Sequence, residues 1–323
     1  MSRETFVDQH KRGWNDLERM LMRLDKRQPV SDPDAFVDHY RQVCQHLALA
    51  RHRHYGPDLV DRLNQLVLRG HQHLYAHQGV ERARVLDYLA GGFAADVRKN
   101  GGYMLVSLLL FGLSFLGAGL AAYYDEELAR AMVSAEALQS MEEMYDPNGG
   151  FQKRGDDFGE RAAMFGYYIY NNTGIALRTF ASGLVFGIGA IFVIVYNGLT
   201  IGCVAGHLTR AGCGEPFWSF VIGHGSFELT AIVLAGGAGL KLGDSLIRPG
   251  RRSRVESLIE SARGSAGLVS GFSLMLFMAA FLEAFWSPLS FIPTNLKLIV
   301  GAGLWVFVIG YLLFAGRRSG HGS

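Results

Sequence analysis

The chain has 323 residues, 49% of them hydrophobic, with 41 glycines, 3 cysteines and a formal net charge of +2. Glycine makes up roughly 13% of the chain against an average of about 7%, and since no Gly-X-Y period or Gly/Ser linker accounts for the excess, collagen-like and disordered chains are excluded. Residues 1–100 are rich in charge, whereas residues 101–323 contain several apolar runs long enough to cross a bilayer, which excludes a soluble enzyme.

A cytoplasmic four-helix bundle is expected over residues 1–99, because apolar residues recur there at helical spacing in four stretches. Ser31 and Pro33 predict the start of the second helix. Gly56-Pro57 is expected to separate the second helix from the third, and Gln78-Gly79 the third from the fourth. Residues 1–27 are charged throughout, so no signal peptide is expected.

The histidines of this region do not predict a metal site. His73 and His77 are four residues apart, but no cysteine or closely placed carboxylate completes a ligand set. The three cysteines form no CxxC pair, which also argues against a disulfide framework. Residues 1–100 hold 16 basic and 13 acidic residues, an excess too small to predict nucleic-acid binding. We therefore expect no metal, no cofactor and no nucleic-acid partner.

About six hydrophobic segments are expected in a transmembrane domain over residues 100–316. The first, Met104–Tyr123, has 20 residues without a charge and is long enough to span a bilayer. The third is short and is separated from the second by Asn197-Gly198, so it either crosses fully or forms a re-entrant hairpin with a neighbour. The other expected segments, in order, are Leu177–Tyr196, Leu199–Cys213, Phe217–Leu240, Ala266–Phe285 and Leu296–Phe314.

The charges between the segments predict the orientation. Segment 125–176 carries ten acids and four bases, whereas residues 241–263 carry six bases and three acids. By the positive-inside rule, the bundle 1–99, the amphipathic segment 241–264 and the tail 317–323 face the cytoplasm of a bacterial inner membrane. The helical segment 125–176 is then external, and an odd number of crossings must connect it to the basic segment.

Glycines at four-residue spacing are typical of closely packed membrane helices. We expect them to pack helices within the chain, with a homodimer face as the alternative, and we expect a homo-oligomer in which a dimer is favoured. The predicted packing positions are Gly183, Gly187, Gly198, Gly202, Gly206, Gly236, Gly237 and Gly239.

A polar site is predicted inside the membrane. His224 and Glu228 are four residues apart and therefore share one face of a helix. Ionisable groups in a membrane segment cost about 2.5–3.5 kcal/mol and are functional candidates by default. A structural polar clasp, a proton-linked or ligand-gated site, and catalysis or metal binding are the open interpretations. Asn172 and Asn197 complete the predicted site.

Motifs of known enzyme classes are not matched. His224 and Glu228 do not form the HExxH pattern of zinc proteases, and the glycine runs lack the lysine of a nucleotide-binding loop. The stretch Gly223–Ser226 lacks the second glycine of a hydrolase nucleophile turn. We therefore expect a chain that is not an enzyme.

Three stretches carry a family resemblance. They are LNQLVLRGHQHLY (Leu63–Tyr75), IYNNTGIALRTFASGLVFGIG (Ile169–Gly189) and, most distinctively, FWSFVIGHGSFELTAIVLAGGAGLKLG (Phe217–Gly243). Together they resemble the stage II sporulation protein M family of bacterial and archaeal membrane proteins. The resemblance implies a membrane partner of cell-envelope proteins without assigned catalysis, and it extends to Asn172, Asn197, His224 and Glu228.

The sequence thus predicts an all-α polytopic membrane protein that serves as a non-catalytic subunit or scaffold of a cell-envelope complex. Its expected partners are the lipid bilayer and other membrane or envelope proteins. The alternative is a transporter or channel whose polar path is lined by Asn197, His224 and Glu228, since broken helices build substrate sites.

Overall fold

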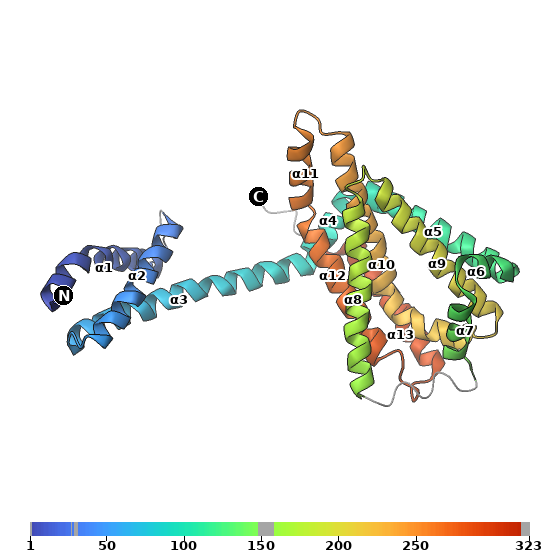
Figure 1. Ribbon diagram of the computed structural model, residues 1–323, viewed down its shortest axis with the longest axis horizontal. Helices are drawn as coiled ribbons and strands as arrows, with labels where there is room; N and C mark the ends of the chain where they lie inside the picture. Colours follow the sequence, from blue (N-terminus) through green and yellow to red (C-terminus); the bar gives the residue numbers. More distant parts are fainter. Residues whose placement is uncertain (1, 27, 29–31, 148–157, 318–323) are drawn as a thin grey trace. The chain divides into compact units, whose positions relative to one another are not determined.

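The computed structural model describes residues 2–26, 28, 32–147 and 158–317, and every element in this part is a helix (Figure 1). The predicted all-α class is therefore confirmed. The chain divides into two compact units, Met1–Asp87 and Tyr88–Ser323. Most of the predicted tail 317–323, and residues 148–157 of the predicted external segment, lie outside the described residues.

The first unit is built from helices α1 (Arg3–Asp25), α2 (Pro33–His52) and α3 (Pro57–Asp87). Asp32 caps α2 by accepting hydrogen bonds from the backbone N–H groups at positions 34 and 35, a role that the sequence assigned to Ser31. The three helices share a buried apolar core. Its members are Phe6, Trp14, Leu17, Leu21, Phe36, Val43, Leu47, Ala50, Tyr55, Leu59, Leu63 and Leu66.

The predicted break at Gln78-Gly79 is wrong, because α3 continues through it to Asp87. A single glycine costs a helix about 1 kcal/mol, which a long helix tolerates, and no proline follows to end it. The region expected to form a fourth helix of the bundle continues as a π-helical turn, η1 (Tyr88–Gly92), and α4 (Phe93–Lys99). Phe93 packs against Leu268 and Phe272, so this region belongs to the second unit.

His46 is held in the aromatic part of the first unit's core. Its Nδ1 accepts a hydrogen bond from Trp14 Nε1 at 3.0 Å, and its ring stacks on His10 with centroids 4.0 Å apart. Burial lowers the pKa of His46, and the neighbouring His10 lowers it further. The fold therefore favours the neutral imidazole.

Five described helices of the second unit are long and apolar enough to cross a membrane: α5 (Gly101–Tyr124), α9 (Ile188–Arg210), α10 (Gly214–Ile247), α12 (Ala266–Phe285) and α13 (Thr294–Phe314). The outward faces of α5 and α13 are apolar, and Leu113 and Val306 are 69% and 73% exposed. An apolar exterior of this kind is typical of a surface in contact with lipid, so the predicted transmembrane character is confirmed.

The boundaries predicted for the second and third hydrophobic segments are wrong. The chain turns at residues 183–187, where Gly187 has φ +80°, and α9 then runs without a break to Arg210. Asn197 does not make a turn, because its side-chain amide donates to the Val193 carbonyl of the same helix at 2.8 Å. The predicted third segment is therefore the second half of α9.

Helices α5 and α9 pack side by side in the same direction. Along α9, the contacts reach successively later residues of α5: Gly198 lies against Ser114, Gly202 against Phe115 and Gly206 against Gly119. A Cβ atom at any of these glycines would collide with α5, so the close approach requires glycine. Because the two helices are parallel, the chain must return between them.

Helix α8 (Phe158–Ser182) makes this return, and it includes residues 158–176 of the segment that is predicted to be external. Its 25 residues extend about 37 Å at 1.5 Å per residue. It packs along α10 and α12, and the buried residues Asn172, Ala176 and Thr179 lie on its inner face. Because α8 carries more polar side chains, it is less apolar than the five helices that are long and apolar enough to cross a membrane. Three long helices, α8, α9 and α10, follow one another between the acidic and the basic segments, and three is an odd number as the charges require.

The other glycines predicted to pack helices also meet neighbours within the chain. The glycines of α10 allow α5, α8 and α9 to approach the backbone of α10 closely. The contacts are Gly236 with Ser107 and Ile194, Gly237 with Met104, Gly239 with Thr179 and Gly183, and Gly187 with Gly243.

Short helices lie at the two ends of the second unit. At one end, α6 (Glu126–Met132) and α7 (Ala135–Met144) cover α9, and Glu142 Oε1 lies 2.6 Å from His207 Nε2. At the other end, α11 (Arg254–Arg263) begins with a capping box between Ser253 and Glu256. The backbone N–H of Ser253 hydrogen-bonds the Glu256 carboxylate and thereby lowers its pKa.

Candidate functional site

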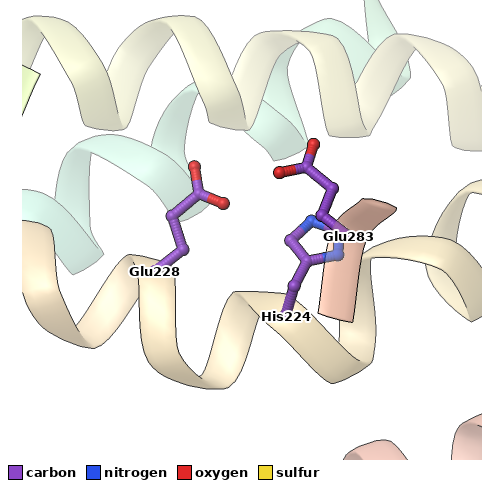
Figure 2. Close-up of side chains that lie close together, drawn as sticks. All are labelled: His224, Glu228 and Glu283. Carbon is purple, nitrogen blue, oxygen red and sulfur yellow. The ribbon is translucent and has the colours of Figure 1, made fainter. Parts of the chain in front are cut away.

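Three titratable side chains meet where α10 contacts α12. His224 and Glu228 come from α10 and Glu283 comes from the last turn of α12, and the potential ligand atoms of all three lie within 4.8 Å of one another. Figure 2 shows both carboxylates on the same side of α10, with the imidazole of His224 beside Glu283. We call these three residues the His–Glu–Glu cluster.

The helical geometry of α10 explains why His224 and Glu228 lie together. The four-residue spacing places His224 and Glu228 on one face of α10, one turn apart. The packing of α12 against this face then brings in Glu283. The cluster is therefore a product of one local spacing and one tertiary contact.

The residues around His224 fix its ring. His224 is 5% exposed, and its Nδ1 lies 3.4 Å from Ser287 Oγ. The ring of Phe220, one turn earlier on α10, meets it edge-on at 5.2 Å between centroids. Lys297 at the start of α13 donates to the Ser287 carbonyl at 2.7 Å, which secures the segment after α12. The Nε2 atom is left facing the carboxylates.

The Glu283 carboxylate is enclosed but incompletely paired. Asn172 of α8, itself 5% exposed, hydrogen-bonds to it. Among the described residues, however, the Oε2 atom of Glu283 is buried without a hydrogen-bond partner. An unpaired buried acceptor costs about 1–3 kcal/mol, and more when it is charged. Such an atom is suited to a proton or a cation that the protein itself does not supply.

Two ionised carboxylates at this separation repel each other strongly. At 4.8 Å, the upper limit of their separation, and an effective dielectric constant of about 20, the repulsion is about 3.5 kcal/mol. A shared proton or a bound cation removes this repulsion. The cluster can therefore hold a proton or bind a cation.

A cavity of about 450 Å³ lies beside the cluster and includes Glu283 in its wall. Glu160 and Arg161 from the start of α8 also line it, together with Met144 of α7. The Nε atom of Arg161 is buried and has no partner within the described part of the chain. The cavity thus connects Glu283 with polar groups at the end of the bundle where α8 begins.

The structure brings together three of the four residues predicted for the polar site. His224 and Glu228 are in the cluster, and Asn172 reaches it through Glu283. Asn197 lies on α9 and bonds to its own helix, next to the contact with α5. It therefore does not share the site as the sequence predicted.

Glu283 is the functional candidate that the sequence analysis missed. The signal was present, because Glu283 is the sole ionisable residue in the predicted segment Ala266–Phe285. Because Glu283 lies two residues before the end of that segment, it is readily interpreted as a residue at the membrane boundary. Lys297 is the second residue of the predicted segment Leu296–Phe314, so it too is readily interpreted as a boundary residue.

Taken together, the helices and the buried cluster define a polytopic α-helical membrane protein with an ionisable site between its helices. A family model described as Stage II sporulation protein M matches residues 107–288, which is more than half of the chain. The chain therefore belongs to the stage II sporulation protein M family, and the matched region includes the whole His–Glu–Glu cluster. A second family model, described as a domain of unknown function (DUF8413), matches residues 4–76 within the first unit. No curated protein and no solved structure matches the chain.

Proposed function

We propose that this chain is a non-catalytic membrane subunit or scaffold that holds other proteins of the cell envelope at the bacterial inner membrane. The observation that carries the proposal is the division into a helical unit with its own core and a unit of apolar helices. A separately folded unit attached to a membrane anchor can bind a partner without help from the membrane helices. Membership of the family supports a membrane role.

The proposed orientation places the first unit, α11 and the C-terminal end in the cytoplasm. It is supported by the six basic residues of 241–263, which lie at the opposite end of the bundle from the acidic helices α6 and α7. The acidic helices would then be outside. A cytoplasmic partner would meet the first unit, and an external partner would meet α6 and α7.

Photocrosslinking of the full-length protein in native membranes tests this proposal. A photoreactive amino acid at the exposed positions Arg12 and Arg41 of the first unit, or Glu136 of α7, should give discrete adducts with other proteins. The control position Leu113 is 69% exposed on the apolar face of α5 and should give mainly lipid adducts. Absence of protein adducts from all three test positions would contradict a scaffold function.

The proposed dimer needs a contact surface other than the predicted glycines. Gly198, Gly202 and Gly206 face α5 of the same chain and are therefore not available to a second copy. The exposed apolar faces of α5 and α13 are the alternatives. Crosslinking between two differently tagged copies at Val306, which is 73% exposed, tests the α13 face.

The second candidate function is transport of a proton or cation, and the His–Glu–Glu cluster beside a cavity favours it. The expected path no longer includes Asn197, because this residue lies on the contact between α9 and α5. In liposomes, the protein should give an ion flux that Glu228→Gln abolishes and Asn197→Ala preserves. Liposomes whose flux equals that of protein-free vesicles would exclude this function.

A further inference from the structure

The His–Glu–Glu cluster has the composition of a metal-ligand set. It offers one imidazole nitrogen and two carboxylates, with all ligand atoms within 4.8 Å of one another. The ligands come from two helices that pack against each other, α10 and α12. Metal sites in helical bundles are built in this way, from side chains of facing helices that project into the core.

We propose that His224, Glu228 and Glu283 bind one divalent transition-metal ion, of the zinc or manganese class, inside the second unit. Calcium and magnesium prefer sites made of oxygen ligands, whereas an imidazole ligand suits zinc, iron and related metals. The mixed nitrogen and oxygen set therefore selects the transition metals. The proposal depends on neither the scaffold function nor transport, and it revises the expectation of no metal, which was reached without Glu283.

The unpaired oxygen of Glu283 supports this proposal independently of the spacing. Oε2 of Glu283 is buried and has no hydrogen-bond partner among the described residues. His224 is 5% exposed and the two glutamates are partly buried, so bulk water has restricted access to the cluster. A dication would satisfy this oxygen and remove the repulsion between the two carboxylates.

Neighbouring residues orient the ligands as they do in known metal sites. A metal-binding histidine generally has its second ring nitrogen hydrogen-bonded to another group. Here Nδ1 of His224 faces the Ser287 hydroxyl at 3.4 Å, and Nε2 is left for the metal. Glu283 is held in the same manner by Asn172 from α8. Three helices therefore contribute to the orientation of the site.

To bind a metal ion, the three side chains would have to move only slightly closer to one another. Tetrahedral zinc with bonds of about 2.0–2.1 Å has ligand atoms about 3.4 Å apart. The separations, which are at most 4.8 Å, therefore have to shorten by at most about 1.4 Å, which rotation about the side-chain bonds of the two glutamates can provide. Three protein ligands leave a position for water, and the cavity beside Glu283 supplies room for it.

Metal binding by the full-length protein in detergent tests the proposal. The protein is stripped with EDTA, equilibrated with Zn²⁺, Mn²⁺ or Mg²⁺ and desalted, and the bound metal is then measured by mass spectrometry. Wild type should retain about one equivalent of Zn²⁺ or Mn²⁺. His224→Gln, Glu228→Gln and Glu283→Gln should each bind at least ten-fold more weakly. His207→Gln, which alters another buried histidine–glutamate pair, and His73→Gln in the first unit should bind normally.

The proposal is overturned if wild type retains no metal, if the three cluster variants bind as wild type does, or if His207→Gln or His73→Gln loses the metal equally. Cobalt provides a second measurement on wild type alone, in case a cluster variant does not fold. Visible absorption of Co²⁺ in a nitrogen and oxygen environment would support the site. The spectrum of free aqueous Co²⁺, or a thiolate band from Cys203 or Cys213, would refute it.

Discussion

Removal of one carboxylate from the His–Glu–Glu cluster is expected to stabilise the metal-free protein. Glu228 and Glu283 lie within 4.8 Å of each other, so when both are ionised they repel by about 3.5 kcal/mol or more at an effective dielectric constant of about 20. Glu283→Gln keeps the shape and the hydrogen bond to Asn172 but removes this repulsion. The variant should therefore unfold at a higher temperature than wild type in EDTA at pH 10. This increase in unfolding temperature should be smaller at lower pH, where a proton shared by the two carboxylates already removes the repulsion in wild type.

Thermal unfolding in detergent provides the measurement, and Glu142→Gln provides a control of opposite sign. Glu142 lies 2.6 Å from His207, so the loss of its charge weakens a favourable contact and should lower the unfolding temperature. If Glu283→Gln is instead less stable than wild type in EDTA at pH 10, the two carboxylates do not repel each other. The description of the cluster would then be wrong.

Three further predictions concern packing, pH and orientation. Gly202→Ala should cost about 1–3 kcal/mol by separating α5 from α9, whereas Gly112→Ala, which has open space, should be neutral or stabilising in the same unfolding assay. The pKa of His46 is lowered on folding, so the stability of the first unit should be full above about pH 6.5 and should fall as the pH drops below it. The hydrogen-exchange protection factors of α1–α3, which are corrected for the intrinsic exchange rate at each pH, should therefore be lower at pH 5.5, and His46→Gln should remove this dependence. In a cysteine-free background, an impermeant maleimide should label Ala211→Cys and Arg251→Cys, exposed positions on either side of α10, from opposite sides of the membrane. Labelling of both positions from one side would refute the arrangement of α10.

Some properties of this protein follow from the sequence because they depend on neighbouring residues alone. The apolar run at Met104–Tyr123 is long enough to span a bilayer whatever surrounds it, and it forms most of α5. The spacing of His224 and Glu228 places them on one face of any helix that contains both. The four-residue spacing of Gly198, Gly202 and Gly206 similarly lines one side of a helix and permits a close neighbour.

Only the tertiary structure decided which helices meet, because local periodicity carries no information about the partner of a helix face. The contact of α10 with α12 turned an isolated pair into a cluster of three by adding Glu283. The parallel packing of α5 and α9 required α8 to return the chain, although the polar residues of α8 made it resemble a loop. Those polar residues are tolerated because the burial of Asn172 against Glu283 replaces the hydration that each would lose.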